Sequence, residues 1–349
     1  MKFLNCPLKN IKGIMRILNI LLGLLKSIRN PSCFNEFFDW FYPDYMNTLA
    51  HVVQTCQDNL DLHKLILKFL RELSSNQTHR LKLDNINAFI MFKAICPILF
   101  TILNYHTNKE YRPIVIILET LRNFLIGRYI SFDYLGIYND RCFIDLILKL
   151  FTVILTIDIK DYYPKLTNVL YSFLSSFFSI RIKDAVKYLV PELFNSILIM
   201  LYYGIESQRS SLVLPASSAI EEISHFFSLQ ILNVKSEFLA SVKEILVVAE
   251  GTLLKITEEL IRTICFDDED YISLLLSPLY SLISIDKRLF QEAKKTLFTK
   301  LPNTDSISKL DGFLDNIANT IEFNGNPEDR DKFISNYLDI SKLIKETYS

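Results

Sequence analysis

The chain is poor in glycine and contains no residue pattern that carries out covalent chemistry. Only 8 glycines and 11 prolines occur among its 349 residues. The glycine-rich motifs that cradle a phosphate or expose a nucleophile, GxxxxGK(S/T), GxGxxG and GxSxG, are all absent from the sequence. The sequence therefore predicts a protein that is not an enzyme and that uses no cofactor.

Histidine and acidic residues are not arranged as metal ligands either. The five histidines form neither HExxH nor a zinc-type spacing with cysteine, and we interpret them as surface or hydrogen-bonded core residues: His51, His63, His79, His106 and His225. Asp267–Asp270 is an acidic run, but it lacks the alternating ligands and the glycine of a calcium loop. We expect this run to cap the helix that follows it, and the sequence predicts no metal site.

Neither sign of charge dominates the chain. The 38 Lys and Arg residues balance 39 Asp and Glu residues, which gives a net charge of -1. The sequence has no run of five or six basic residues, a feature typical of proteins that bind the phosphates of nucleic acids. We therefore expect no nucleic-acid partner.

The six cysteines lie tens of residues apart and never form a CxxC pair: Cys6, Cys33, Cys56, Cys96, Cys142 and Cys265. This spacing predicts buried, reduced thiols rather than a disulfide framework or a zinc site. Reduced thiols are typical of a cytosolic or nuclear protein.

The apolar runs are shorter than a membrane span requires, although the mean hydropathy is +0.22. Leu166–Ile180 and Ala94–Asn108 are uncharged over 15 residues each, whereas a spanning helix needs about 18 to 20 apolar residues. Near the N-terminus, Arg16 and Asn19 interrupt the apolar stretch and no small-residue cleavage site follows it. We expect neither a membrane protein nor a signal peptide.

What the chain does have is helical periodicity. One set of apolar residues recurs at i, i+3, i+4, i+7, i+8 and i+11, a spacing that gathers side chains on one face only in a helix: Leu62, Leu65, Ile66, Phe69, Leu70 and Leu73. A second set begins at Phe143 with the same offsets, and no comparable stretch alternates with period two. The pattern predicts an all-α protein.

The periodic stretches predict a series of helices at residues 9–28, 33–57, 60–74, 86–106, 112–127, 142–157, 163–179, 185–203, 212–232, 237–264, 269–284, 287–300, 306–322 and 329–347. Taken two at a time, they give about seven antiparallel hairpins, with a period close to that of HEAT and armadillo repeats. We therefore expect a HEAT/ARM-like α-solenoid over residues 1–349 with no separate second domain. An irregular helical bundle is the alternative. Pro97, Pro191 and Pro278 lie within apolar runs and are expected to kink a helix or to mark its start.

Several local segments go beyond patterning and resemble a known family. They are Phe38–Met46, which holds the single Trp, Leu67–Leu73 with Asn76–Asp84, Gly127–Phe132 with Gly136–Asp140, and Asp161–Leu166 with Tyr171–Leu174. In this order and spacing they resemble the C-terminal part of the exportin-7 and Ran-binding protein 16/17 family of importin-β-like karyopherins. Asp329–Phe333 is similar to the closing segment of that family.

The resemblance implies a superhelix of HEAT repeats that carries protein cargo through the nuclear pore in a Ran-GTP-dependent manner. It also implies contacts with Phe-Gly nucleoporins and shuttling between nucleus and cytoplasm. The chain begins where the final third of the family's sequence begins, so we expect Ran-GTP to bind only through N-terminal repeats that this sequence lacks. A truncated gene model is the favoured explanation, with a genuine short paralogue as the alternative.

The alternative function is a stand-alone α-helical repeat adaptor or structural protein that has lost transport. Exposed charges such as Lys149 and Lys165 are candidates for cargo contact, but a solvated helix face is the favoured interpretation of both. The sequence therefore assigns no residue to a partner-binding site.

Overall fold

The structure is a computed structural model. It describes residues 11–76, 79–81, 86–105, 110–130, 140–157, 163–207, 209–266, 272–299, 311–312, 314–315 and 328–336. These residues form helices and their connections, and no strand occurs among them. The contacts divide the chain into two compact units, Met1–Ser176 and Phe177–Ser349.

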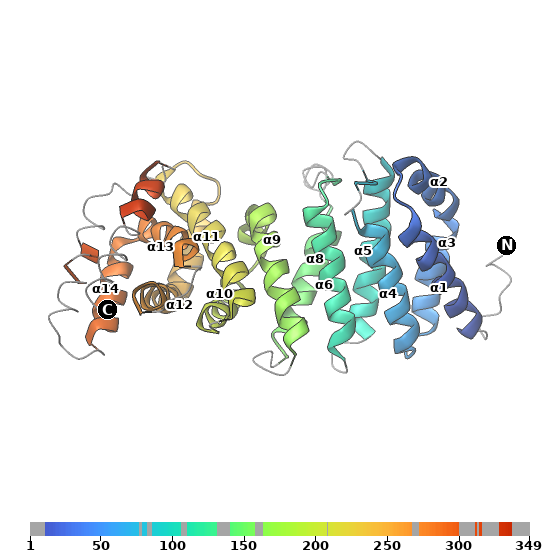
Figure 1. The fold of residues 1–349 in the computed structure, drawn as a ribbon, viewed down its shortest axis with the longest axis horizontal. Helices are drawn as coiled ribbons and strands as arrows, with labels where there is room; N and C mark the ends of the chain where they lie inside the picture. The colour runs from blue at the N-terminus through green and yellow to red at the C-terminus, as the bar shows by residue number, and fades with distance from the viewer. Residues whose placement is uncertain are drawn as a thin grey trace. The chain divides into compact units, whose positions relative to one another are not determined.

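Unit 1 stacks helices in two series (Figure 1). Its helices are α1 (Ile11–Ser27), α2 (Pro31–Phe41), α3 (Asp44–Thr55), α4 (Leu60–Ser74), α5 (Ile86–Tyr105), α6 (Tyr111–Ile126), α8 (Cys142–Ile154) and the first part of α9 (Pro164–Tyr188). In one series α1 packs on α4 and α4 on α6, and in the other α3 packs on α5 and α5 on α8. Contacts of α5 with α4 and α6 join the two series. Each helix therefore packs on its neighbours in the stack, as in a helical repeat.

Local sequence explains where the helices of unit 1 begin and end. The Asn59 side chain accepts a hydrogen bond from the Leu62 N–H at 3.0 Å and caps the start of α4. Asn30 caps Ser32 in the same way at 2.8 Å, with Pro31 in the first position of α2. The apolar stripe of α4 then faces the core, and all six of its periodic residues are buried.

The core of unit 1 is rich in phenylalanine. Phe92 of α5 is fully buried and meets the Phe124 ring of α6 edge-on, with a centroid distance of 5.0 Å and an interplanar angle of 87°. Its ring also lies 5.8 Å from that of Phe143 at the start of α8. One side chain thus joins three helices.

Unit 2 repeats the same order of packing. Its helices are the rest of α9, α10 (Pro191–Glu206), α11 (Ser210–Leu232), α12 (Leu239–Phe266), α13 (Ile272–Ile285) and α14 (Lys287–Thr299), and residues 328–336 are also helical. Helix α10 packs on α12 and α12 on α14, while α11 packs on α13. Phe194 is buried between the rings of Phe178 and Phe227, with centroid distances of 5.8 and 5.6 Å.

The prediction of an all-α helical repeat solenoid is confirmed by this sequential packing of helix on helix in both units. That residues 1–349 form one array without a second domain stays a prediction. The helices expected at 306–322 and 329–347 fall largely outside the described residues, although 328–336 is helical.

Two expected helix boundaries were wrong. The helix expected at 33–57 is two helices, because Tyr42 before Pro43 is extended, at φ -100° and ψ 141°, as a residue preceding proline prefers. Residues 180–184 were expected to separate two helices. They instead lie within α9, which bends at Arg181 and ends at Tyr188. Pro191 marks the true start of α10, whereas Pro97 and Pro278 lie inside α5 and α13.

The expectation that every apolar run is too short to span a membrane was wrong for one helix of the described residues, because α5 is long and apolar enough by length and composition. Half of its apolar window is buried inside the protein. Because α5 packs against α3, α4, α6 and α8, its place in the core accounts for its composition.

Candidate functional site

Among the described residues, no group of three or more His, Cys, Asp or Glu side chains is placed to hold a metal ion. The Asp267–Asp270 run and His106 lie outside the described residues. His63 is buried on α4 with its ring 6.2 Å from that of Tyr105. Unit 1 contains a buried polar junction, a thiol pair and a basic face.

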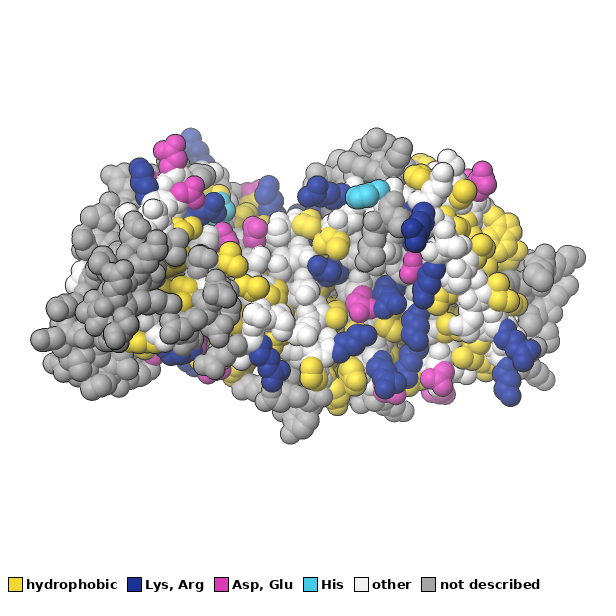
Figure 2. Space-filling model, viewed as in Figure 1, with side chains coloured by type: hydrophobic (Ala, Val, Ile, Leu, Met, Phe, Trp, Pro, Cys, Tyr) yellow, Lys and Arg dark blue, Asp and Glu magenta, His cyan; other side chains and the backbone are white. Residues whose placement is uncertain are grey.

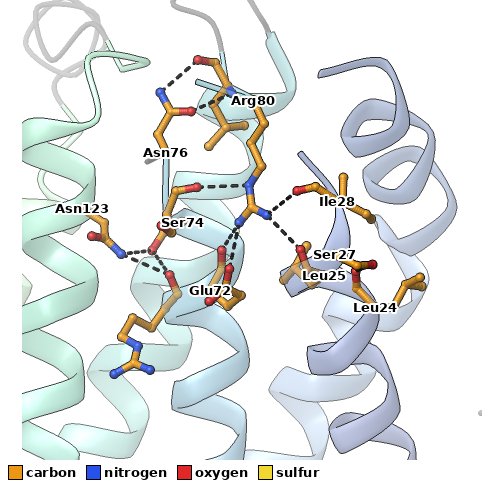
Figure 3. Close-up of polar contacts among 12 residues, drawn as sticks. Leu24, Leu25, Ser27, Ile28, Glu72, Ser74, Asn76, Arg80 and Asn123 are labelled. Carbon is orange, nitrogen blue, oxygen red and sulfur yellow. Dashed lines mark hydrogen bonds and ion pairs between the residues drawn. The ribbon is translucent and has the colours of Figure 1, made fainter. Parts of the chain in front are cut away.

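The centre of the polar junction is Arg80, a buried arginine in the connection after α4 (Figure 3). Its guanidinium donates to the carbonyls of Leu25 and Ile28 at the end of α1, at 3.0 and 3.2 Å. It also donates to the carbonyls of Ser75, at 3.1 Å, and Glu72 at the end of α4. The last carbonyls of a helix have no partner within the helix, so one side chain caps two helices.

Charge and packing support Arg80 in this position. The Glu72 carboxylate lies 3.6 Å from the guanidinium, and the Phe34 ring centroid lies 5.0 Å from its central carbon. Burial lowers the pKa of Arg80 and Glu72 opposes that shift. An arginine stays protonated even so, because its ordinary pKa lies far above neutral pH. The junction is thus a buried charge whose hydrogen bonds and counter-ion offset the cost of burial.

The other half of the junction joins α4 to the end of α6. The Asn76 amide donates to the carbonyls of Leu81, at 3.0 Å, and Gly127, at 2.8 Å. The Tyr129 hydroxyl donates to the Ser74 carbonyl at 2.6 Å. Asn123 donates to the Ser74 hydroxyl at 3.3 Å, as Figure 3 shows. Adjacent helices of the stack are therefore tied by directional bonds as well as by apolar contact.

Gly127 is required by the approach of the Tyr129 ring. A Cβ atom at position 127 would lie 2.2 Å from a Tyr129 ring carbon and 2.6 Å from the Asn123 carbonyl oxygen. No side chain fits at such distances without moving one of these groups. The glycine therefore allows the chain to turn after α6 while the tyrosine remains buried.

Two of the segments that carry the family resemblance meet at this junction. Asn76–Asp84 supplies Asn76 and Arg80, and Gly127–Phe132 supplies Gly127 and Tyr129; residues 77–78, 82–85 and 131–132 lie outside the described residues. Their side chains are directed at helix ends and at each other. The described side chains Asn76, Arg80 and Tyr129 of these segments therefore serve the stacking of helices.

The thiol pair joins α5 to α8. Cys96, which is buried, and Cys142, the first residue of α8, form a hydrogen bond between their thiols. That bond, followed by Lys93, lowers the pKa of Cys142 to about 7 against the opposing effect of burial. Lys93 itself pairs with Asp140, two residues before Cys142.

Selective alkylation will test this lowered pKa. We expect the rate of Cys142 modification by iodoacetamide, followed by peptide mass spectrometry, to rise with a midpoint near pH 7 because the thiolate is the nucleophile. The Cys96→Ala variant removes the hydrogen bond and will move the midpoint upward. N-acetylcysteine in the same mixture is the reference thiol, and a Cys142 midpoint equal to that of the reference would contradict the assignment.

The basic face consists of six cationic side chains on three helices of unit 1. They are Lys64, Lys68 and Arg71 of α4, Arg112 and Arg122 of α6, and Lys165 in the first turn of α9. Figure 2 shows Lys and Arg side chains gathered over α4 and α6.

Ion pairs place the cations of α4 on the side of unit 1 that faces the carboxylates of Glu110 and Glu119. Lys64 Nζ lies 2.6 Å from Glu110 Oε2, directly before α6, and 3.7 Å from Asp61 Oδ1. Arg71 pairs with Glu119 in the middle of α6. The face therefore mixes cations with three carboxylates, and it keeps an excess of positive charge in a chain whose net charge is -1.

The sequence named Lys165 of this face and also Lys149, which is not part of it, but the other five cations of the face were missed. Lys149 on α8 is half-buried, and Lys165 is exposed. A run of basic residues was the wrong signal, because these cations come from three helices. The i, i+4, i+7 spacing of Lys64, Lys68 and Arg71, opposite the apolar stripe of α4, is the signal that finds them.

The fold and these features define an all-α helical repeat protein. No family model matches the chain. It aligns over 96% of its length with exportin-7 of Dictyostelium discoideum at 21% identity, and over 90% with Ran-binding protein 17 of Mus musculus at 22% identity. Exportin-7-B of Xenopus laevis aligns with 96% of the chain at 20% identity.

The chain is therefore a distant homologue of exportin-7 and Ran-binding protein 17 over nearly its whole length. It spans about a third of the length of these curated relatives: 34%, 31% and 33%. Among solved structures, an engineered protein aligns with 96% of this chain at 13% identity and a TM-score of 0.41. The alignment covers 81% of the engineered protein's chain. The fold assignment rests on the packing order of the helices, not on that likeness.

Proposed function

We propose that residues 1–349 act as part of a nuclear transport receptor of the exportin-7 type, which carries protein cargo through the nuclear pore and shuttles between nucleus and cytoplasm. The observation that carries the proposal is the alignment of 96% of the chain with exportin-7. Ran-binding protein 17, aligned with 90% of the chain, supports the same assignment. A non-enzymatic carrier also suits a chain without catalytic motifs.

The proposed mechanism uses the stacked helices as a deformable array. Because each helix packs only on its neighbours in the stack, small changes at successive contacts add up along the chain. A cargo that touches several helix pairs binds most tightly to one arrangement and so selects it. In a complete receptor, Ran-GTP and cargo that favour the same arrangement strengthen each other's binding reciprocally.

A chimaera tests the proposal in a complete receptor. Residues 1–349 replace the aligned segment of Dictyostelium exportin-7, and nuclear export of a cargo of that exportin is measured in permeabilised cells with Ran-GTP. We expect the chimaera to export the cargo. A chimaera that binds Ran-GTP but leaves the cargo in the nucleus would contradict the proposal and favour a stand-alone adaptor.

The Ran-GTP contact of the proposed receptor lies outside residues 1–349. We expect Ran-GTP to retain full-length Dictyostelium exportin-7 in a pull-down, and to retain this chain no better than Ran-GDP does. The GDP-bound form is the matched control. Nucleotide-dependent retention of the chain by itself would assign a Ran contact to the helices described above.

Weak retention on Phe-Gly repeats is expected of residues 1–349 alone. Transient contacts of this kind come from exposed apolar side chains that accept a phenylalanine ring. The purified chain is run over immobilised Phe-Gly repeats, and the control column carries repeats with serine in place of phenylalanine. Delayed elution from the first column only is the expected result, and identical elution from both would count against transport.

A further inference from the structure

We propose that the basic face of unit 1 binds an acidic polypeptide segment of a partner protein. This inference rests on the proposed function, because it names the chemistry of the cargo or adaptor segment that the receptor would contact. It concerns a surface to which the sequence assigned no partner.

The first support is unpaired positive charge. Lys68, Arg112, Arg122 and Lys165 are exposed and have no ion-pair partner among the described residues. Lys64 and Arg71 engage the carboxylates of the face, so these four remain available for carboxylates of another chain. Arg112 and Arg122 in particular present planar guanidinium groups that bind a carboxylate through two parallel hydrogen bonds.

The second support is the spacing of the available cations. Arg112 and Arg122 stand roughly 15 Å apart along α6, at about 1.5 Å per residue, and neighbouring packed helices lie about 8 to 10 Å apart. An extended polypeptide advances about 3.3 Å per residue. A segment with an acidic residue at about every third position therefore matches the face as it crosses from α4 to α6 and α9.

The third support is an aromatic pair at one end of the face. The rings of Tyr111, at the start of α6, and Tyr163, directly before α9, lie 4.4 Å apart and are half-buried. Tyr111 directly precedes Arg112 in the sequence, and Tyr163 lies two residues before Lys165. Tyrosine and arginine are the residue types that carry most of the binding energy at protein interfaces, so the face offers an anchor as well as charge.

The composition of the face favours a polypeptide over a nucleic acid. Asp61, Glu110 and Glu119 lie among the cations, and their charges repel a continuous row of phosphates. An acidic polypeptide can place uncharged residues opposite these carboxylates. Its charges are then complementary to the face residue by residue.

Fluorescence anisotropy tests this inference with a labelled 20-residue peptide of Glu, Ser and Gly, Glu at every third position. The control peptide carries Gln in place of Glu. We expect residues 1–349 to bind the Glu peptide and to lose affinity as salt rises. The double variant Arg112→Glu and Arg122→Glu will bind about tenfold more weakly, because two attractive charges become repulsive. The affinity of the milder double variant, Arg112→Gln and Arg122→Gln, for the Glu peptide will lie between the affinities of the Glu double variant and the unmodified chain.

The matched control is the pair Lys243→Glu and Lys255→Glu, which makes the same charge change at exposed positions of α12 in unit 2. It should leave peptide binding unchanged. Three results would each overturn the inference. They are an equal loss of affinity for the Glu peptide in both double variants, binding of the Gln peptide as tight as that of the Glu peptide, and binding of a 20-nucleotide single-stranded RNA tighter than that of the Glu peptide.

The Phe-Gly column separates this inference from the proposed function. Each variant and the unmodified chain are run on that column from the same preparation. If the unmodified chain were retained on the Phe-Gly column but did not bind the Glu peptide, the inference of an acidic partner would be overturned and the transport proposal would stand. Peptide binding lost in the arginine variant, with retention on Phe-Gly repeats unchanged, is the result that supports both.

Discussion

Replacing Arg80 with alanine is expected to destabilise unit 1 by about 3 to 5 kcal/mol, the usual cost of breaking a buried, hydrogen-bonded charge. The change removes donors to four backbone carbonyls and leaves the Glu72 carboxylate without its cation. Arg80→Lys keeps the charge but not the planar fork, and it will recover only part of the loss.

Hydrogen exchange is the measurement for this variant, because stacked helices open locally and one unfolding free energy does not describe a long array. Amides in the last turns of α1 and α4 will lose protection, whereas α12 in unit 2 will keep it. Arg122→Ala, an exposed arginine of the same unit, is the control and should change stability by less than about 0.5 kcal/mol. Unchanged protection of α1 in Arg80→Ala would refute the junction.

Phe92→Ala is the second substitution with a large expected effect, a loss of about 3 to 5 kcal/mol. The ring is fully buried and contacts aromatic rings of both α6 and α8, so its removal leaves a cavity where three helices meet. Loss of the edge-on contact with Phe124 adds to the free energy lost with the buried apolar area. Phe92→Leu fills most of the space and will cost less.

The matched control for Phe92 is Phe194→Ala, which removes a buried phenylalanine between two rings of unit 2. We expect the first variant to raise exchange in α5, α6 and α8, and the second to raise it in α10 and α11. The two patterns should not overlap. If Phe92→Ala lowered protection evenly through both units, the chain would unfold as one cooperative body and the local packing argument would fail.

Most of the helices could be predicted from the sequence, because their stability comes from apolar stripes whose helical spacing is visible in the sequence itself. Leu62, Ile66 and Phe69 recur at helical spacing, and all are fully buried. The break at Tyr42–Pro43 was missed because the apolar pattern continues through it, and only the backbone restriction before proline reveals it. Periodicity reports which face is buried and is a weak guide to where one helix ends.

The polar junction could not be predicted in the same way. Arg80 binds carbonyls of α1 that precede it by more than fifty residues, and a backbone carbonyl has no signature in the sequence. Tyr129 and Ser74 are likewise brought together only by the packing of α6 on α4. The basic face required the same tertiary information, since α4, α6 and α9 contribute three, two and one of its cations.

The capping of two helices by Arg80 also fixes their axial register. Apolar stripes repeat along a helix, so α1 could slide along α4 by one turn, about 5.4 Å, and still find apolar partners. The hydrogen bonds of a single guanidinium to both helix ends cannot survive such a shift. Adjustments between these two helices are therefore restricted to small tilts about a pinned end, and the opposite ends carry the larger displacement.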